Sequence, residues 1–513
     1  MATVADRVDG GGATEPATRA REAEAPPITL GTRLSYGVGA TANGLKGAAF
    51  NTYLMFFYNQ VIGVPAAVVS TALALTLLVD ALVDPVIGRW SDTTRTRWGR
   101  RHPFIYGAVV PTAVLFSLVW FPPTGVSNLV YGLWIFTFAA LTRMALSAFE
   151  ITTSAMAPEL TSDYRERTRL FSIRYWFGYA GTFGFMAFSL TVFFAATPEY
   201  PRGQLNPDGY VGFALTGATV IGLAMLICGL GTHNRIPYLR QAEARGERRS
   251  AGVHVREMLG ALNNRAFLAI FGFGVLKYTA IGLYAGCNLY FGTYLFQLGG
   301  KQLALLTFDG LIAATIAAPL APVMSGWLGK RNSAMLFAVC GVALGLSPLV
   351  LAYNRMFWPV GHPMLVPTLF VIGALYGAMV AISLINTSSM LADVVEDSAV
   401  KTGRHDAGVF FSAASFMQQC SSALGILATG LILTWSAFPE KPRPGTVTEA
   451  MTDSLLIHYF PTTMALWTLG ALILLFYPIT KAKHESNVEV LRAREAEARL
   501  REAENTPLGA PAR

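Results

Sequence analysis

Charged side chains are scarce in this chain of 513 residues. Asp, Glu, Lys and Arg together make up 14% of it, whereas hydrophobic residues make up 53%. A soluble domain carries about 25% charged residues. The scarcity therefore excludes an ordinary soluble protein and indicates an integral membrane protein whose first partner is the lipid bilayer.

Cysteine and histidine are also rare, with four and seven residues. The cysteines lie in apolar stretches without metal-ligand spacing, so we expect small core residues and neither a disulfide framework nor a metal centre. No nucleophile, base and orienting group occur at compatible spacing, and no Gly-rich phosphate loop occurs. We therefore expect no enzyme and no cofactor. The first 27 residues have no apolar core, which argues against a signal peptide.

Apolar stretches long enough to cross a bilayer, about 20 residues each, recur along most of the chain. They predict an all-α membrane protein with about twelve transmembrane helices. The predicted spans lie near 33–60, 66–89, 103–121, 128–157, 169–195, 209–232, 265–297, 302–328, 333–353, 365–392, 407–436 and 454–480.

Basic residues gather in the connections that follow the even-numbered spans, with the longest basic stretch between the sixth and seventh. The positive-inside rule then places both termini in the cytoplasm and assigns the net charge of +8 to topology instead of nucleic-acid binding. The predicted domains are a cytoplasmic tail 1–30, a six-helix half 31–232, a cytoplasmic loop 233–264, a second six-helix half 265–480 and a cytoplasmic tail 481–513.

Short strings repeat at matching places in these halves. PVIGRW (85–90) closes the second span and PVMSGW (322–327) closes the eighth, while APEL (157–160) ends the fourth and LADV (391–394) ends the tenth. Matching marks in two groups of six spans are typical of a duplicated transporter fold.

Two carboxylates, Asp80 and Asp84, lie one helical turn apart within the second span. They share one helix face, and acidic groups in a bilayer are costly, so they usually face a water-filled path for an ion or substrate. A solvated position at the membrane surface is the alternative. After Pro85 the chain leaves the helix into an arginine-rich loop, whose candidate gating residues are Asp92, Arg97, Gly99, Arg100 and Arg101.

Other polar residues lie inside predicted spans. Arg143 and Glu150 are seven residues apart, so they lie on one helix face about two turns apart. Across a central cavity, three basic residues can balance three acidic ones charge for charge: Lys46, Arg143 and Arg174 against Asp80, Asp84 and Glu150. A purely structural ion-pair network is the alternative, and Arg174 can instead snorkel to the surface. Lys277 and Asp309 have no evident partner. Uncharged candidates for the same site are Asn43, Gln418 and Gln419.

These residues occur in motifs that resemble the glycoside-pentoside-hexuronide:cation symporter family of the major facilitator superfamily, the group around the melibiose permease. The matching strings are SYGVGA and YLMFFYNQVIG in the first span, DALVDPVIGRWSD with RTRWGRRHPF after the second, APEL with RERTRLFSIRYWFGYAG, and LADVVED with GRHDAG. The resemblance implies cation-coupled uptake by alternating access. It also implies that Asp80 and Asp84 bind H+ or Na+ and that Glu150 and Arg174 belong to the substrate site.

The chain departs from the family pattern at three places. Gly44 stands where the resemblance implies a sugar-binding Asp, Val83 where it implies an Asn that helps to hold Na+, and Gln418 or Gln419 where it implies a Lys. Because Na+ needs several oxygen ligands whereas one carboxylate carries a proton, we expect H+ in preference to Na+. Lys46 is a candidate for the missing positive charge.

The sequence thus predicts a monomeric secondary transporter of a bacterial inner membrane that imports a sugar, glycoside or carbohydrate acid with a cation. One alternative keeps the fold but changes the substrate to an amphipathic lipid or other hydrophobic solute, since aromatic residues are abundant and the sugar-binding Asp is absent. Another is a membrane sensor that transports nothing and whose charged C-terminal helix recruits partners.

Overall fold

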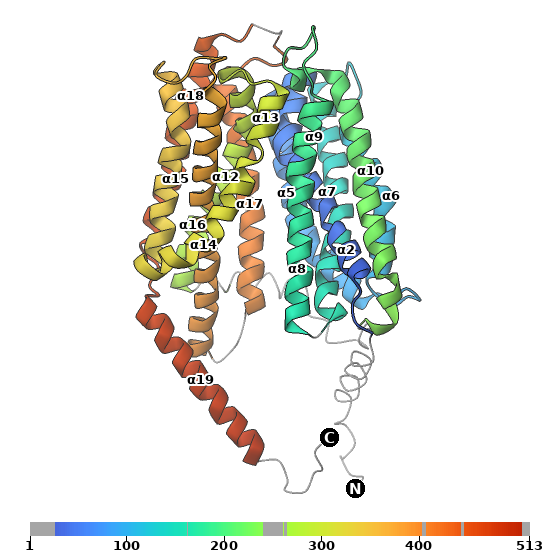
Figure 1. Ribbon diagram of the computed structural model, residues 1–513, viewed down its shortest axis with the longest axis vertical. Coiled ribbons are helices and arrows are strands. Elements are labelled where there is room, and N and C mark those ends of the chain that lie inside the picture. The colour runs from blue at the N-terminus through green and yellow to red at the C-terminus, as the bar shows by residue number, and fades with distance from the viewer. Residues whose placement is uncertain are drawn as a thin grey trace.

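The computed structural model describes residues 26–161, 163–239, 260, 264–402, 407–442 and 446–504. Within these ranges the regular elements are helices, without a strand, and most run along one axis as an upright bundle (Figure 1). Ten helices are long and apolar enough to cross a membrane. The predicted first and fifth spans are the two others, and each is built from shorter helical pieces. The prediction of an all-α membrane fold with about twelve spans is confirmed.

The helices of residues 30–238 pack mainly with one another and form the N-terminal half of the bundle. Side chains of Thr29, Asp163 and Asn206 cap helix starts by accepting hydrogen bonds from backbone amides that lack helical partners. The elements are α2 (Leu30–Val38), α3 (Ala40–Ala48), η1 (Ala49–Tyr53), α4 (Leu54–Phe56), η2 (Phe57–Ile62), α5 (Ala66–Thr93), α6 (His102–Val119), α7 (Asn128–Leu160), α8 (Tyr164–Tyr179), η3 (Ala180–Gly184), α9 (Phe185–Val192), η4 (Gly203–Leu205), α10 (Pro207–Thr232) and η5 (His233–Tyr238).

A second group of helices forms the C-terminal half. Its members are α12 (Arg265–Tyr290), η6 (Phe291–Leu295), α13 (Gly300–Leu306), α14 (Asp309–Leu328), α15 (Lys330–Tyr353), α16 (Leu365–Thr402), α17 (Ala407–Trp435) and α18 (Glu449–Leu474), followed by α19 (Lys481–Glu504). Most ends agree with the predicted spans within a few residues. The exception is α16, which continues ten residues beyond the predicted end at 392 because the polar sequence DVVEDSAVKT extends it past the apolar stretch.

Figure 1 shows α2 starting and α19 leaving at the same end of the bundle, here called the lower end. There α19 contacts α16: Asn487 is 1% exposed and donates to the Asp397 carboxylate at 3.2 Å. The charged C-terminal helix, which begins the predicted cytoplasmic tail, therefore docks at its start and projects away afterwards (Figure 1).

The repeated strings form matching ion pairs at the lower end. Glu159 of APEL accepts from Arg100 at 2.7 Å and from Arg101 at 2.9 Å, and Asp393 of LADV accepts from Lys330 at 2.6 Å. In each half, an acidic residue in the lower part of the fourth helix thus binds a basic residue that follows the second. The strings that repeat in the sequence therefore make corresponding ion pairs in the two halves of the structure.

At the opposite, upper end the two halves are joined by hydrogen bonds that we call the upper seam. Tyr290 donates to Asn59 Oδ1 at 2.9 Å and Tyr294 donates to Gln60 Oε1 at 2.5 Å. Gln60 also donates to the carbonyl of Pro439 at 3.1 Å. Asn59, Gln60 and Tyr290 are at most 2% exposed, so the hydrogen bonds of the seam are buried between the two halves at the upper end.

Candidate functional site

Asp80 and Asp84 lie on α5, a helix that is long and apolar enough to cross a membrane. Asp80 is buried, accepts a hydrogen bond from Ser147 at 3.1 Å and lies 3.6 Å from the Arg143 guanidinium. Arg143 also lies over the ring of Phe50, 5.4 Å from its centroid. The solvated position at the membrane surface is therefore wrong for Asp80, because the carboxylate faces α7 inside the N-terminal half.

Asp84 faces the other half. Gln419 on α17 donates to Asp84 Oδ2 at 3.1 Å, whereas the buried Oδ1 atom has no hydrogen-bond partner. Gln418 is exposed and does not reach Asp84, because successive residues on a helix point about 100° apart. Of the two glutamines that sequence analysis left open, Gln419 is the one that joins the halves at this carboxylate.

Glu150 and Arg174 form the second pair. Arg174 donates to Glu150 Oε1 at 2.6 Å and to Ser154 at 2.9 Å, and it lies over the ring of Tyr36. Arg174 is 8% exposed, so the alternative in which it snorkels to the surface is wrong. Glu150 Oε2 keeps no partner. The pair therefore presents one free carboxylate oxygen beside a fixed guanidinium.

Lys46 connects the two pairs. It lies close enough to Arg143, Asp80, Glu150 and Asp84 to interact with each electrostatically. We call Lys46, Asp80, Asp84, Arg143, Glu150 and Arg174 the charged cluster. It has three positive and three negative groups, so its formal charge sums to zero.

Asn43 lies one helical turn before Lys46 on α3. Both residues are half-buried. Neither side chain makes a hydrogen bond to another described residue. Their polar atoms are therefore available to a bound molecule.

The packing around Gly44 explains why α3 has no acidic residue at position 44. A Cβ atom on Gly44 would lie 2.1 Å from the carbonyl oxygen of Gly178 on α8, and one on Gly181 would lie 2.7 Å from the carbonyl of Thr41. The backbones of the first and fifth spans therefore touch, and no side chain fits between them. The departure at Gly44 is a packing requirement of this fold.

Three of the predicted gating residues, Asp92, Arg100 and Arg101, form one network below the charged cluster. Arg101 is 4% exposed and bridges Asp92 at 2.7 Å and Glu159 at 2.9 Å, while Arg100 pairs with Glu159. Gly99 has φ of +71°, a conformation that residues with a Cβ rarely adopt, so it makes the turn before the two arginines. Arg97 stays outside the network and lies over the ring of Trp98.

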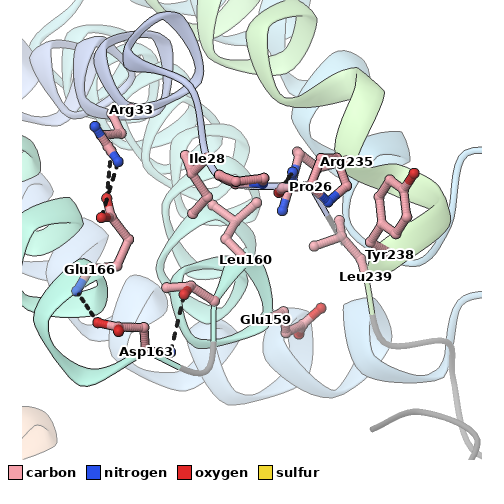
Figure 2. A pocket seen from close by; sticks show the side chains of 12 residues that line it. Pro26, Ile28, Arg33, Glu159, Leu160, Asp163, Glu166, Arg235, Tyr238 and Leu239 are labelled. Carbon is pink, nitrogen blue, oxygen red and sulfur yellow. Dashed lines mark hydrogen bonds and ion pairs between the residues drawn. The ribbon is translucent and has the colours of Figure 1, made fainter. Parts of the chain in front are cut away.

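Figure 2 shows a pocket beside this network, lined by α2 and the residues before it, by the α7–α8 connection and by η5 with Leu239. Arg33 pairs there with Glu166, and Arg235 donates to the carbonyl of Pro26 at 2.6 Å. The pocket holds Glu159 but none of the charged cluster. Its lining comes from the N-terminal half alone, which separates it from the site between the halves.

The chain was compared with known proteins. The family model described as MFS/sugar transport protein matches residues 35–481. The chain belongs to the MFS/sugar transport protein family. It is 26% identical to the isoprimeverose transporter of Lactiplantibacillus pentosus, with 88% of this chain and 88% of that protein covered.

Two further matches come from a mouse protein and a solved structure. The chain is 25% identical to the sphingosine-1-phosphate transporter MFSD2B of Mus musculus, over 91% of this chain and 93% of that protein. The inward open structure of the xylose transporter XylE from E. coli shares the fold with a TM-score of 0.57 at 14% identity, over 90% of this chain and 98% of that chain.

Membership of this family, whose members are transporters, gives the charged cluster its context but does not itself assign the residues. Sequence analysis missed several partners that the structure supplies: Ser147, Ser154, Tyr36 and Glu159. The hydroxyl-bearing residues give no signal in a membrane helix, where they are common. Glu159 did give a signal, since it belongs to the repeated APEL string, but its arginine partners lie 58 and 59 residues away in sequence.

Proposed function

We propose that the chain couples H+ entry to uptake of a sugar or glycoside by alternating access, as a multi-pass transporter of a bacterial inner membrane. Asp84 carries the proposal. It lies on α5 of one half, is bonded to Gln419 of the other, and keeps one buried oxygen without a partner. Protonation of a carboxylate in that position directly changes the hydrogen bond that joins the two halves.

Three features favour H+ over Na+ as the coupling ion. Val83 offers no side-chain oxygen, Arg143 approaches Asp80, and Ser147 donates its hydroxyl to Asp80. Na+ would have to displace or repel these groups to gather its ligands, whereas a proton needs only the free oxygen of Asp84. Protonating Asp84 also removes a negative charge whose burial is costly when the halves close over it.

In the proposed cycle the lower end faces the cytoplasm and the structure represents the inward-facing state, with the upper seam closed. The cation binds Asp84, the sugar hydroxyls bond to the free oxygen of Glu150 and to Asn43, and the two halves then rock about this level. Arg174 orients Glu150, and Lys46 keeps the cluster neutral overall. The ion pairs of Glu159 and Asp393 hold the lower ends of their halves rigid during the movement.

Uptake by proteoliposomes tests the proposal. The full chain is reconstituted and offered labelled pentosides, hexosides, glucuronides and lysolipids, with pH and Na+ gradients imposed separately. We expect accumulation of a glycoside under a pH gradient and loss of accumulation in Asp80→Asn and Asp84→Asn. Accumulation that survives in both variants would remove these residues from coupling, and a protein that transports nothing would favour the sensor alternative.

An amphipathic lipid remains the second candidate substrate on the same fold. Two observations favour it: Gly44 leaves no room for an acidic side chain beside α8, and Tyr175, Trp176 and Tyr179 of α8 are at least half exposed. The mouse relative is named for a lipid phosphate. Competition by lysolipids but not by sugars in the same proteoliposomes would select this candidate.

A further inference from the structure

Lys277 is a buried cation that the charged cluster does not use. It lies in the middle of α12, is 1% exposed and makes no ion pair or hydrogen bond with another described residue. Its ammonium lies over the rings of Phe273 and Tyr278, 4.9 and 4.7 Å from their centroids. No acidic group of the described chain acts on it electrostatically.

Two contacts between α12 and α17 set the level of Lys277 in the bundle. A Cβ atom on Gly274 would touch Met417, and Thr279 donates to the carbonyl of Ser421 at 3.2 Å. Lys277 lies between Gly274 and Thr279, just as Gln419 lies between Met417 and Ser421. Because Gln419 binds Asp84, Lys277 lies within about one helical turn of the level of the cation site.

The face of α12 that carries Lys277 combines polar residues with the apolar Phe273 and Ile281, one turn to either side of the lysine. Lys277, Tyr284 and Asn288 recur at spacings of seven and four, so they share one side of the helix. Gly282 and Gly286 face α17, and Gly272 faces α18, on other sides. Asn288 is exposed although it belongs to an apolar helix, and Tyr284 contacts Tyr376 of α16. Lys277, Tyr284 and Asn288 are thus the polar groups of an otherwise mixed face.

Lys277 lies outside the charged cluster, and the partly buried Asp309, which makes no ion pair with a described residue either, acts electrostatically on Tyr284 and Tyr376. The charged cluster sums to zero, and burying a lone ammonium is costly because no counter-charge replaces its water. Aromatic rings recover part of that cost. A bound anion would recover far more, because an ammonium and a carboxylate or phosphate oxygen form a charge-assisted hydrogen bond.

We propose that Lys277 is the anion subsite of the transported molecule, which thus carries an acidic group held against the C-terminal half. Tyr284 and Asn288 lie on the same face, about 10 and 16 Å further along the helix, where they supply hydrogen-bonding groups for the rest of the molecule. The proposal rests on the proposed transport function and specifies its substrate class: an acidic glycoside or an acidic lipid, whose shared feature is one carboxylate or phosphate group.

Matched pairs of probes test the subsite in proteoliposomes that contain the full chain. One pair is 4-nitrophenyl β-D-glucuronide and the corresponding neutral glucoside; the other is lysophosphatidate and the neutral monoacylglycerol. Each pair differs in the acidic group and shares the rest. The variants are Lys277→Gln, which removes the charge, Lys277→Arg, which keeps it, and Lys301→Gln as a control at an exposed lysine of α13.

We expect Lys277→Gln to raise KM for the acidic member of one pair about 10- to 100-fold, the range for a lost hydrogen bond to a charged group. The neutral member should not change, Lys277→Arg should retain most of the preference, and Lys301→Gln should match the unchanged protein. The pair that responds identifies the source of the acidic group. Equal effects of Lys277→Gln on both members, or none on either, would overturn the subsite.

A binding measurement covers the case in which none of the probes is transported. The midpoint of thermal unfolding is then recorded with each probe and with inorganic phosphate. A stabilisation by acidic probes that Lys277→Gln removes supports the subsite, and its absence overturns it. The proposed transport function is read separately, from the dependence of accumulation on Asp84, so the two proposals fail by different results.

Discussion

The upper seam makes a quantitative prediction about the balance between the two orientations of the transporter. Changing Tyr290 and Tyr294 to Phe removes two hydroxyl donors and leaves the packing of the rings in place. Asn59 Oδ1 keeps its second donor, Gln60 Nε2 at 2.6 Å, so that change costs about 1 kcal/mol. Gln60 Oε1 loses its tyrosine donor while buried, which costs about 1 to 3 kcal/mol.

The two changes together should destabilise the closed seam by about 2 to 4 kcal/mol relative to a state in which water reaches these groups. At about 1.4 kcal/mol per factor of ten, the population with an open upper end should rise by a factor of roughly 30 to 700. Distances between spin labels at positions 199 and 356 measure it. Both positions are exposed, and they belong to loops of different halves.

The labels require a background without the four native cysteines, whose transport is checked first. The control is Tyr53→Phe, which removes a buried tyrosine hydroxyl that pairs with Ser189 within the N-terminal half. We expect a longer distance to appear in the double variant and not in the control. An unchanged distance distribution, or the same change in both, would refute the seam as the upper closure.

Four further outcomes are expected. Glu159→Gln removes the buried one of the two counter-charges of Arg101, so the unfolding midpoint should fall by the equivalent of about 1.5 to 3 kcal/mol, whereas Glu199→Gln at an exposed site should leave it unchanged. Gly44→Asp should lower the amount of folded protein and restore no sugar binding, since its Cβ would meet the Gly178 carbonyl; binding of a sugar with normal folding would contradict this. Arg174→Lys should retain the charge beside Glu150 but raise KM for the substrate, and an unchanged KM would remove Arg174 from the site. Asn487→Ala should release the start of α19 to limited proteolysis while uptake continues; loss of uptake would give the helix a role beyond docking.

The fold was predictable because the bilayer constrains it. A stretch of about 20 apolar residues has few alternatives to a helix in lipid, so runs such as 209–232 and 333–353 correspond closely to α10 and α15. The breaks within the first and fifth spans were not predictable. One of them, η3, lies against α3, where Gly181 touches Thr41, which is a contact between distant segments that no local pattern encodes.

The candidate site was predictable as a set of charges but not as a set of pairs. Burial cost identifies Asp80, Glu150 and Arg143 from sequence, because a charge in an apolar run needs a partner. Spacing within α7 suggested Arg143 and Glu150 as neighbours, yet each pairs with a residue of another helix. The choice of Gln419 over Gln418 required the rotation of α17 about its axis, which only the packed bundle fixes.

The central claim is that Asp84 binds the proton that drives uptake. The most direct test records the internal pH of proteoliposomes with a trapped dye when a transported substrate is added outside, with no gradient and no Na+ present. The account predicts acidification that accompanies substrate entry in the unchanged protein, and substrate entry without acidification, or no entry at all, in Asp84→Asn. Acidification of equal size in Asp84→Asn, or substrate entry that requires Na+ and leaves the internal pH constant, would contradict it.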